Sequence, residues 1–269
     1  MSDLSLLVVC LASTLGSNLL GFRRTVWFVS IGYTFSVAIG TVLVAALASR
    51  LRLHNGLQLA ILFVWAARLG YFLVQRDRNE RYRQAVDDQT GRAQALPLSA
   101  KLGIWISTSV LYVTMLSPAV FSLAPLDPAR VVGSGLVYLG IVVMIAGVVI
   151  ESIADRQKTR FKREHPGQFT NVGLYRWVRC PNYLGEILVW LGSYVVGLVF
   201  YAAWWHWVMA GVGLICIVLI MIGSTKRLEK KHGERYGHDE RFREYCRSVP
   251  VLFPWVPIYT LRNVRVYLE

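Results

Sequence analysis

The chain has 269 residues, of which 55% are hydrophobic and only 17% are charged, and its formal net charge is +13. Soluble domains carry about a quarter charged residues, so this composition excludes a soluble globular domain. Apolar stretches of about 20 residues recur along the chain, and each is long enough to cross a hydrocarbon core of about 30 Å. We therefore predict an all-α, polytopic membrane protein.

Seven such stretches follow one another in chain order. No basic residues precede the first stretch, as they would in a secretory signal, so we expect it to remain as an anchor. No glycine- or serine-rich linker and no internal repeat divides the chain, which predicts one integral membrane domain over residues 1–269. The seven predicted transmembrane helices are Leu4–Phe22, Thr25–Ser49, Gly56–Gln75, Lys101–Ala124, Val131–Ala154, Tyr183–Tyr201 and Trp204–Gly223.

The linkers between these spans predict the orientation of the chain. Only Arg50, Arg52 and Arg130 lie in the linkers of one side, whereas the other side and the tail hold nearly all remaining Lys and Arg residues. Cytoplasmic linkers carry the excess of basic residues, so we expect the N-terminus outside and the C-terminus in the cytoplasm. This topology explains most of the positive charge, and nucleic-acid binding is not predicted.

The first four spans, within residues 1–124, carry little polar chemistry. Arg68 is the exception, because it lies about seven residues inside the third span, where a charged side chain is costly and often functional. A buried acidic partner would explain Arg68 equally well. The residue alone does not separate a ligand-binding role from a structural one.

The end of the fifth span is rich in charged residues. Glu151, Asp155, Lys158 and Lys162 recur at three- and four-residue steps, so they share one face if the helix continues past the membrane surface. A functional face and an amphipathic helix with internal salt bridges both fit this spacing.

The start of the sixth span combines cations with a helix-initiating residue. Pro181 favours the first turn of a helix, whose unpaired N–H groups point towards the preceding segment. With Arg176 and Arg179 nearby, this is a candidate anion site. Glu186 lies one turn inside the span beyond Asn182 and is expected to face a polar interior, because lipid does not accommodate a carboxylate.

The tail after the last span mixes basic and aromatic residues. Such a mixture suits a ligand with phosphates and an adenine, and it equally suits a helix at the membrane surface. The four cysteines and five histidines are dispersed, so no disulfide or metal site is predicted. Prolines at three positions predict an extended ending: Pro250, Pro254 and Pro257.

Three segments together resemble the C-terminal half of the steroid 5-alpha-reductase superfamily, in particular its bacterial members of unassigned substrate. They are residues 155–162, residues 173–177 (Gly-Leu-Tyr-Arg-Trp) and residues 179–187 (Arg-Cys-Pro-Asn-Tyr-Leu-Gly-Glu-Ile). The resemblance implies a seven-helix fold in a bacterial inner membrane, with NADPH bound from the cytoplasm. It also implies hydride transfer to the β-carbon of an enone in a hydrophobic, steroid-like or isoprenoid lipid.

Because polar and charged residues concentrate from the fifth span onward, we expect a four-helix substrate-side part at 1–124 and a cofactor-binding part at 125–269. The Gln-Glu-Leu-Pro element of steroid reductases is absent here, and Trp65 stands where their third-helix Tyr would be. Either Tyr33 or Tyr71 therefore donates the proton, with Glu186 as a further catalytic residue, or the substrate is not a 3-keto steroid. The implied cofactor-binding residues are Asp155, Lys158, Lys162, Arg176, Arg179, Asn182, Glu186, Arg68, Glu229, Arg235, Tyr236 and Tyr245.

Two other functions remain open at this point. Membrane methyltransferases for isoprenylcysteine and phospholipids have a similar Arg-His-Pro-x-Tyr element and bind S-adenosylmethionine, but Cys180 replaces that His here. The cations at Lys158 and Lys162 favour NADPH, because its phosphates need cations and S-adenosylmethionine has no phosphate. A non-catalytic lipid-binding protein is the third possibility, and no oligomeric state is predicted.

Overall fold

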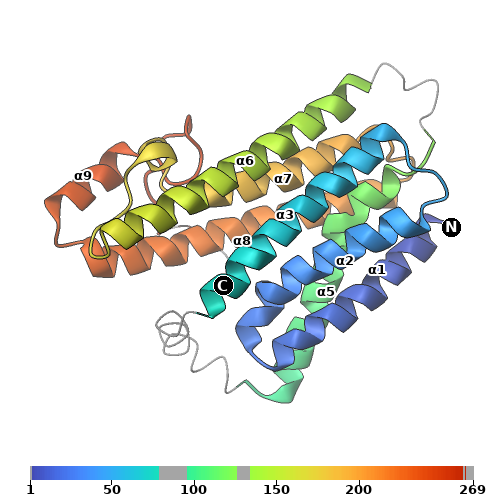
Figure 1. Cartoon of the computed structure of the whole chain (residues 1–269), viewed down its shortest axis with the longest axis horizontal. Coiled ribbons are helices and arrows are strands. Elements are labelled where there is room, and N and C mark those ends of the chain that lie inside the picture. The colour runs from blue at the N-terminus through green and yellow to red at the C-terminus, as the bar shows by residue number, and fades with distance from the viewer. Residues whose placement is uncertain (1, 79–95, 126–133, 263, 265–269) are drawn as a thin grey trace. The chain divides into compact units, whose positions relative to one another are not determined.

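The computed structural model describes residues 2–78, 96–125, 134–262 and 264. Within these ranges the chain forms eight α-helices, so the all-α prediction is confirmed for the described residues. The helices, labelled as in Figure 1, are α1 (Asp3–Asn18), α2 (Ile31–Leu47), α3 (Leu53–Asp77), α5 (Leu98–Phe121), α6 (Ser134–Glu164), α7 (Pro181–Gly197), α8 (Trp204–Tyr236) and α9 (Glu240–Ser248).

Five helical segments are long and apolar enough to cross a membrane. They include Gly135–Glu164 of α6 and all of α3, α5 and α8, together with α1 extended to Phe22. The prediction of an integral membrane protein is supported by these helices. Helices α2 and α7 occupy the second and sixth predicted spans but have only 17 residues each, so the count of seven crossing helices stays a prediction.

The second predicted span begins too early in the sequence. Residues Thr25–Val29 form a short 3-10 turn, and α2 begins only at Ile31 because the backbone of Ser30, at φ −130° and ψ −91°, interrupts the helix. The ring of Phe28 packs over Gly21, where an added Cβ would lie 2.1 Å from the ring. The first residues of the fifth predicted span, 131–133, lie outside the described residues.

Helices α6 and α8 both extend beyond the apolar stretches that predicted them. The fifth span was expected to end at Ala154, yet α6 continues to Glu164, and α8 continues past Gly223 to Tyr236. The charged face from Glu151 to Lys162 therefore lies on one continuous helix, as its spacing suggested.

The chain packs as two compact units, and the division cuts through α6, α7 and α8. Unit 1 comprises Met1–Ile141 and Ser193–Gly213, and unit 2 comprises Val142–Gly192 and Leu214–Glu269. The sequence predicts a different division, between a substrate-side part at 1–124 and a cofactor-binding part at 125–269. That division concerns the roles of the two parts and not their packing, and it stays a prediction.

Neutral polar side chains join several helices of unit 1. Asn18 of α1 is fully buried and donates from Nδ2 to Oγ1 of Thr108 on α5 over 2.7 Å. Ser17 and Ser36 share a hydrogen bond of 2.9 Å between α1 and α2. Gln58 of α3 is also fully buried and donates from Nε2 to Oγ of Ser193 over 3.0 Å. Such bonds hold helices together where lipid offers no partner.

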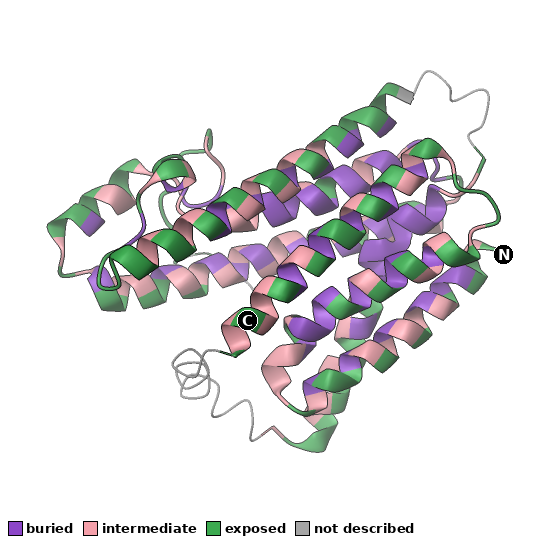
Figure 2. Ribbon diagram, in the orientation of Figure 1, coloured by how far each residue is buried: buried purple, intermediate pink, exposed green. Residues whose placement is uncertain are grey.

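Unit 2 gathers the charged ends of the long helices. Figure 1 shows the end of α6, the loop that follows it, α9 and the end of α8 lying together. Figure 2 shows buried and exposed residues on opposite sides of α6, whereas Leu191 is the only exposed residue of α7. An aromatic cluster of Phe169, Tyr236 and Phe242 fills the space beside α9.

Candidate functional site

Helices α6 and α7 touch through two glycines. A Cβ at Gly147 would lie 2.6 Å from the carbonyl oxygen of Gly185, and a Cβ at Gly185 would lie 2.7 Å from that of Gly147. The same Cβ would lie 2.8 Å from the backbone nitrogen of Glu151, so this buried carboxylate is held beside the first turns of α7. Backbones approach this closely only where side chains are absent.

The loop between α6 and α7 is fixed by Gln157. Its Oε1 accepts from the backbone N–H of Leu174 over 2.9 Å. Gly173 lies directly against this side chain with φ +59°, and a Cβ there would be 2.3 Å from Nε2 of Gln157. Only glycine tolerates both the backbone conformation and the contact. The loop then turns Tyr175 inwards, with its OH 3.4 Å from the carbonyl oxygen of Ala154.

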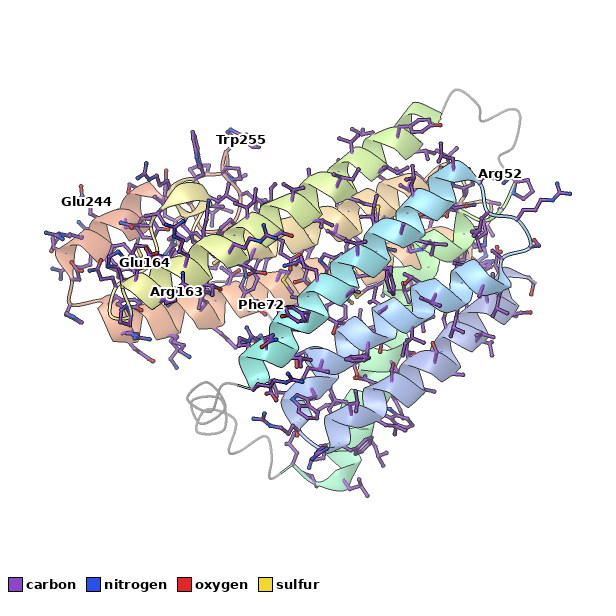
Figure 3. All side chains as sticks on the ribbon, viewed as in Figure 1. Arg52, Phe72, Arg163, Glu164, Glu244 and Trp255 are labelled. Carbon is purple, nitrogen blue, oxygen red and sulfur yellow. The ribbon has the colours of Figure 1, made fainter. Side chains whose placement is uncertain are left out.

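A C-terminal strap, which we define as residues 250–262, is attached directly ahead of α7. The N–H groups of Arg179 and Cys180 donate to the carbonyl oxygens of Pro250 and Val251, both over 3.0 Å. The N–H of Val251 in turn donates to Ile258 over 2.9 Å, which folds the strap back on itself. Figure 3 shows Trp255 at the projecting end of this segment.

A buried ion pair joins the segment ahead of α7 to α8, and its carboxylate also binds the strap. Nη2 of Arg179 lies 3.0 Å from Oε1 of Glu229, and the two side chains are only 10% and 6% exposed. The second carboxylate oxygen of Glu229 accepts from the N–H of Leu261 over 2.8 Å. Arg179 also donates to the carbonyl oxygen of Tyr259 and, over 3.1 Å, to Sγ of Cys246. Both charges therefore have several partners, as buried charges require.

These elements enclose a cavity of about 30 Å³. A cavity needs about 10–15 Å³ to hold a water molecule, so this one has room for solvent and not for a large ligand. Its lining comes from α6, the following loop, α7, α8, α9 and the strap. The lining residues are Lys158, Lys162, Phe169, Thr170, Tyr175, Arg179, Cys180, Asn182, Leu228, Glu229, His232, Phe242, Tyr245 and Val251.

Cations outnumber acids around this cavity. Lys158, Lys162 and Arg179 line it, whereas Glu229 is the only carboxylate among the lining residues. Nζ of Lys162 donates to the OH of Tyr236 over 2.7 Å and to the carbonyl oxygen of Gln168. A charge-assisted bond to a phosphate oxygen could replace either of these neutral acceptors.

Burial holds three ionisable lining groups outside the helices that could span the membrane in their neutral forms, namely Tyr175, Tyr245 and Cys180. Burial raises the pKa of Tyr175 well above its usual value, and the nearby carboxylate of Asp155 raises it further. Burial also raises the pKa of Tyr245, whose OH donates to the carbonyl oxygen of Tyr175 over 2.6 Å. The pKa of Cys180 is raised to about 11 by burial, so its thiol is not a nucleophile near neutral pH.

The structure brings together many of the cofactor-binding residues expected from the sequence. Tyr236 contacts the lining through Lys162, and both Asp155 and Glu186 are buried in unit 2 without lining the cavity. Arg176 and Arg235 are exposed, and Arg235 donates to Pro166 over 3.1 Å. The expected residues that line the cavity are Lys158, Lys162, Arg179, Asn182, Glu229 and Tyr245.

The remaining expected residues belong to unit 1. The ring of Tyr33 is buried, 4.9 Å from Tyr112 and 5.4 Å from Trp65, measured between centroids. Tyr71 is 70% exposed, and Arg68 is partly buried on the same helix. None of these expected residues lines the cavity of unit 2, and their roles stay predictions.

Several lining residues were not among those expected from the sequence. His232 follows Glu229 by three residues and Leu228 by four on α8, so helical spacing could have placed it on the same face. Thr170 and Phe169 carry no such signal, because their position depends on how the loop after α6 packs against α9.

Most of the chain matches one protein family, and shorter segments of it are similar to two known proteins. A family model described as "Protein of unknown function (DUF1295)" matches residues 21–249. The steroid 5-alpha-reductase DET2 of Arabidopsis thaliana is 38% identical over 77 residues, which are 28% of this chain and 26% of that protein. An uncharacterized protein of Schizosaccharomyces pombe is 36% identical over 87 residues, 32% of this chain and 24% of that protein. The chain thus spans about a quarter of the length of these relatives, and no solved structure matches it significantly.

Proposed function

The chain belongs to the DUF1295 family, and we propose that this protein is an NADPH-dependent membrane reductase of a carbon–carbon double bond in a hydrophobic, sterol-like or isoprenoid substrate. The observation that carries the proposal is the cation-rich lining of the unit 2 cavity. The partial similarity to a protein named steroid 5-alpha-reductase supports the same reaction class.

The donor set of the cavity suits the phosphates of NADPH. Lys158 and Lys162 of α6 and Arg179 of the following segment supply three cations, and Gln157 binds that segment to α6. Phosphate oxygens form charge-assisted hydrogen bonds with such groups, and these bonds are about twice as strong as neutral ones. S-adenosylmethionine carries no phosphate and would leave this excess of cations uncompensated.

The volume of about 30 Å³ requires the cavity to open before a dinucleotide binds. In our proposal the strap and α9, which contribute Phe242, Tyr245 and Val251 to the wall of the cavity, move to open it. Arg179 contacts the strap through Tyr259, so in our proposal it exchanges this neutral carbonyl for a phosphate oxygen as the strap moves.

In this proposal the first turns of α7 connect the cofactor to the substrate. Asn182 lines the cavity and Glu186 lies one turn further along the helix, buried at 7% exposure. When bound, NADPH supplies a hydride to one carbon of the double bond. Asn182 would orient the cofactor, and Glu186 would hold a proton close to the substrate. A tyrosine, Tyr33 or Tyr71, would donate the proton to the substrate.

The proposed topology has seven crossing helices in a bacterial inner membrane. The N-terminus would lie outside and the cavity of unit 2 would face the cytoplasm, where NADPH is available. Apolar helices would give a lipid substrate access from the bilayer, and exclusion of water would protect the hydride step.

Equilibrium titration of the detergent-purified full chain with NADPH tests this proposal. The double variant Lys158→Gln/Lys162→Gln is expected to weaken NADPH binding at least about 100-fold, since two charged bonds are lost and each is worth about 1.5–3 kcal/mol. Arg160→Gln/Arg163→Gln is the matched control, because it removes the same charge from exposed positions of α6. Figure 3 shows Arg163 beside Glu164 at the end of this helix.

The titration is repeated with S-adenosylmethionine. Negligible NADPH binding together with tight S-adenosylmethionine binding would replace the reductase with a membrane methyltransferase. Equal NADPH affinity in the double variant and in the wild type would show that the cavity of unit 2 is not the NADPH site.

A further inference from the structure

A second hollow in unit 2 lies on a different face of α8 and plays no part in the proposed reaction. It is an open groove of about 420 Å³, which is within the range of about 300–1,000 Å³ typical of small-molecule sites. We call it the basic groove. Its lining residues are Lys226, Arg227, Lys230, Gly233, Glu234 and Arg262.

The charge of the basic groove is strongly positive. Four of its six lining residues are cations, and Glu234 is the only acid among them. Arg227 is oriented by a bond of 2.9 Å from its Nη2 to Oγ of Ser224. Several converging cations of this kind recognise a phosphate group.

Arg262 reaches the basic groove from the far end of the strap. The neighbouring N–H of Leu261 is bonded to Oε2 of Glu229 over 2.8 Å, which fixes the backbone at this point. Nη2 of Arg262 donates to the carbonyl oxygen of Glu229 over 3.4 Å. The same nitrogen packs against Gly233, where an added Cβ would lie only 2.3 Å from it. The preference for basic residues in cytoplasmic segments explains the cations of α8. It does not explain why Arg262 packs against Gly233 and lines the same groove.

The position of the basic groove along α8 indicates the source of the phosphate. The 20 residues of the apolar stretch Trp204–Gly223 span about 30 Å, which is the thickness of the hydrocarbon core. Lys226 follows within one turn, so the groove begins at the level of the lipid headgroups. We propose that the basic groove binds the phosphate of an anionic phospholipid.

Native mass spectrometry of the full chain, titrated with dioleoyl phosphatidylglycerol or dioleoyl phosphatidylcholine, tests this site. Saturable binding with a preference for phosphatidylglycerol is expected. The triple variant Lys226→Gln/Arg227→Gln/Lys230→Gln should weaken phosphatidylglycerol binding about 100-fold, because each cation near an anionic surface is worth about fivefold in affinity. The matched control, Arg241→Gln/Arg243→Gln/Arg247→Gln, removes the same charge from α9 and should retain wild-type affinity.

Gly233→Ala tests the geometry without changing the charge. The new Cβ displaces Arg262, and phosphatidylglycerol binding should weaken about fivefold, which corresponds to the loss of one cation. Equal affinity of the wild type for both lipids, or equal weakening by the α9 control, would overturn the proposal. Saturable binding of inorganic phosphate without a lipid preference would overturn the assignment to a lipid headgroup.

Discussion

The two units use buried polar residues in different ways. In unit 1, side chains such as Asn18, Gln58 and Thr108 are neutral, and they form hydrogen bonds between neighbouring helices. In unit 2, Arg179, Lys162 and Glu229 are charged and surround one cavity. The polar groups of unit 1 replace the hydrogen bonds that lipid cannot offer, whereas those of unit 2 create a local excess of positive charge.

This difference separates stability from ligand binding. A neutral hydrogen bond within a membrane bundle contributes about 1 kcal/mol and favours one packing of the helices. A set of buried cations is costly unless an anion accompanies it. We therefore expect substitutions in unit 1 to change the stability of the protein and substitutions in unit 2 to change the affinity for a ligand as well.

The largest effect is expected at the ion pair of unit 2. Arg179→Met leaves Glu229 buried without its partner, which should lower the free energy of unfolding by about 3–5 kcal/mol. Thermal unfolding in detergent measures this loss, and Arg176→Met, at an exposed position, is the control. The double variant Arg179→Met/Glu229→Met should recover most of the stability without NADPH affinity. Full NADPH affinity in the double variant would contradict the role given to Arg179.

The next largest effect concerns the contact between α6 and α7. Gly185→Ala places a Cβ 2.7 Å from the carbonyl oxygen of Gly147, and we expect a loss of about 1–3 kcal/mol because backbone atoms cannot move aside. Gly211→Ala is the matched control, since nothing lies within 4 Å of its added Cβ. Equal melting temperatures for the two variants would show that the glycine contact does not determine the packing.

A smaller effect should appear in unit 1 without any change in ligand binding. Gln58→Leu removes both hydrogen bonds to Ser193 and should destabilise the protein by about 1 kcal/mol. Gln75→Leu, at an exposed position of the same helix, should have little effect. A decrease in NADPH affinity larger than the loss of stability of Gln58→Leu accounts for would contradict the proposed difference between the two units.

The smallest expected effect is chemical and leaves the fold unchanged. Because the pKa of Cys180 is raised to about 11, only about one thiol in a thousand is ionised at pH 8. Alkylation of Cys180 by iodoacetamide, followed by peptide mass spectrometry, should accelerate as the pH rises from 8 towards 11. Rapid alkylation at pH 8 in the folded protein, at the rate found in dodecyl sulfate, would show that the cavity is open to solvent.

The helices were largely predictable because their apolar stretches exceed the length of ordinary buried helices. The sequence also indicated that Pro181 begins a helix, and α7 does begin there. The ends were harder to predict. Ser30 interrupts the second predicted span, and a hydropathy pattern does not detect such a local change of backbone geometry. Helix α6 continues to Glu164 through charged turns, which a hydropathy pattern does not count as part of a span.

The candidate site was predictable only in part. Helical spacing placed Lys158 and Lys162 on one face, and both line the cavity. Thr170 lies there through packing of the loop after α6, and the partnership of Arg179 with Glu229 joins residues 50 positions apart. Contacts of this kind arise from tertiary packing and have no periodic signal. Tyr33 and Tyr71 came from the comparison with steroid reductases and Arg68 from its position inside a predicted span, and all three still await a test.

Hydrogen–deuterium exchange of the full chain, with and without NADPH, tests the central claim most directly. Our account predicts that NADPH slows exchange within unit 2, in residues 155–162, 170–182 and 229–262, and leaves residues 14–18 and 108–109 of unit 1 unchanged. Protection confined to unit 1, or the absence of protection at saturating NADPH, would contradict it.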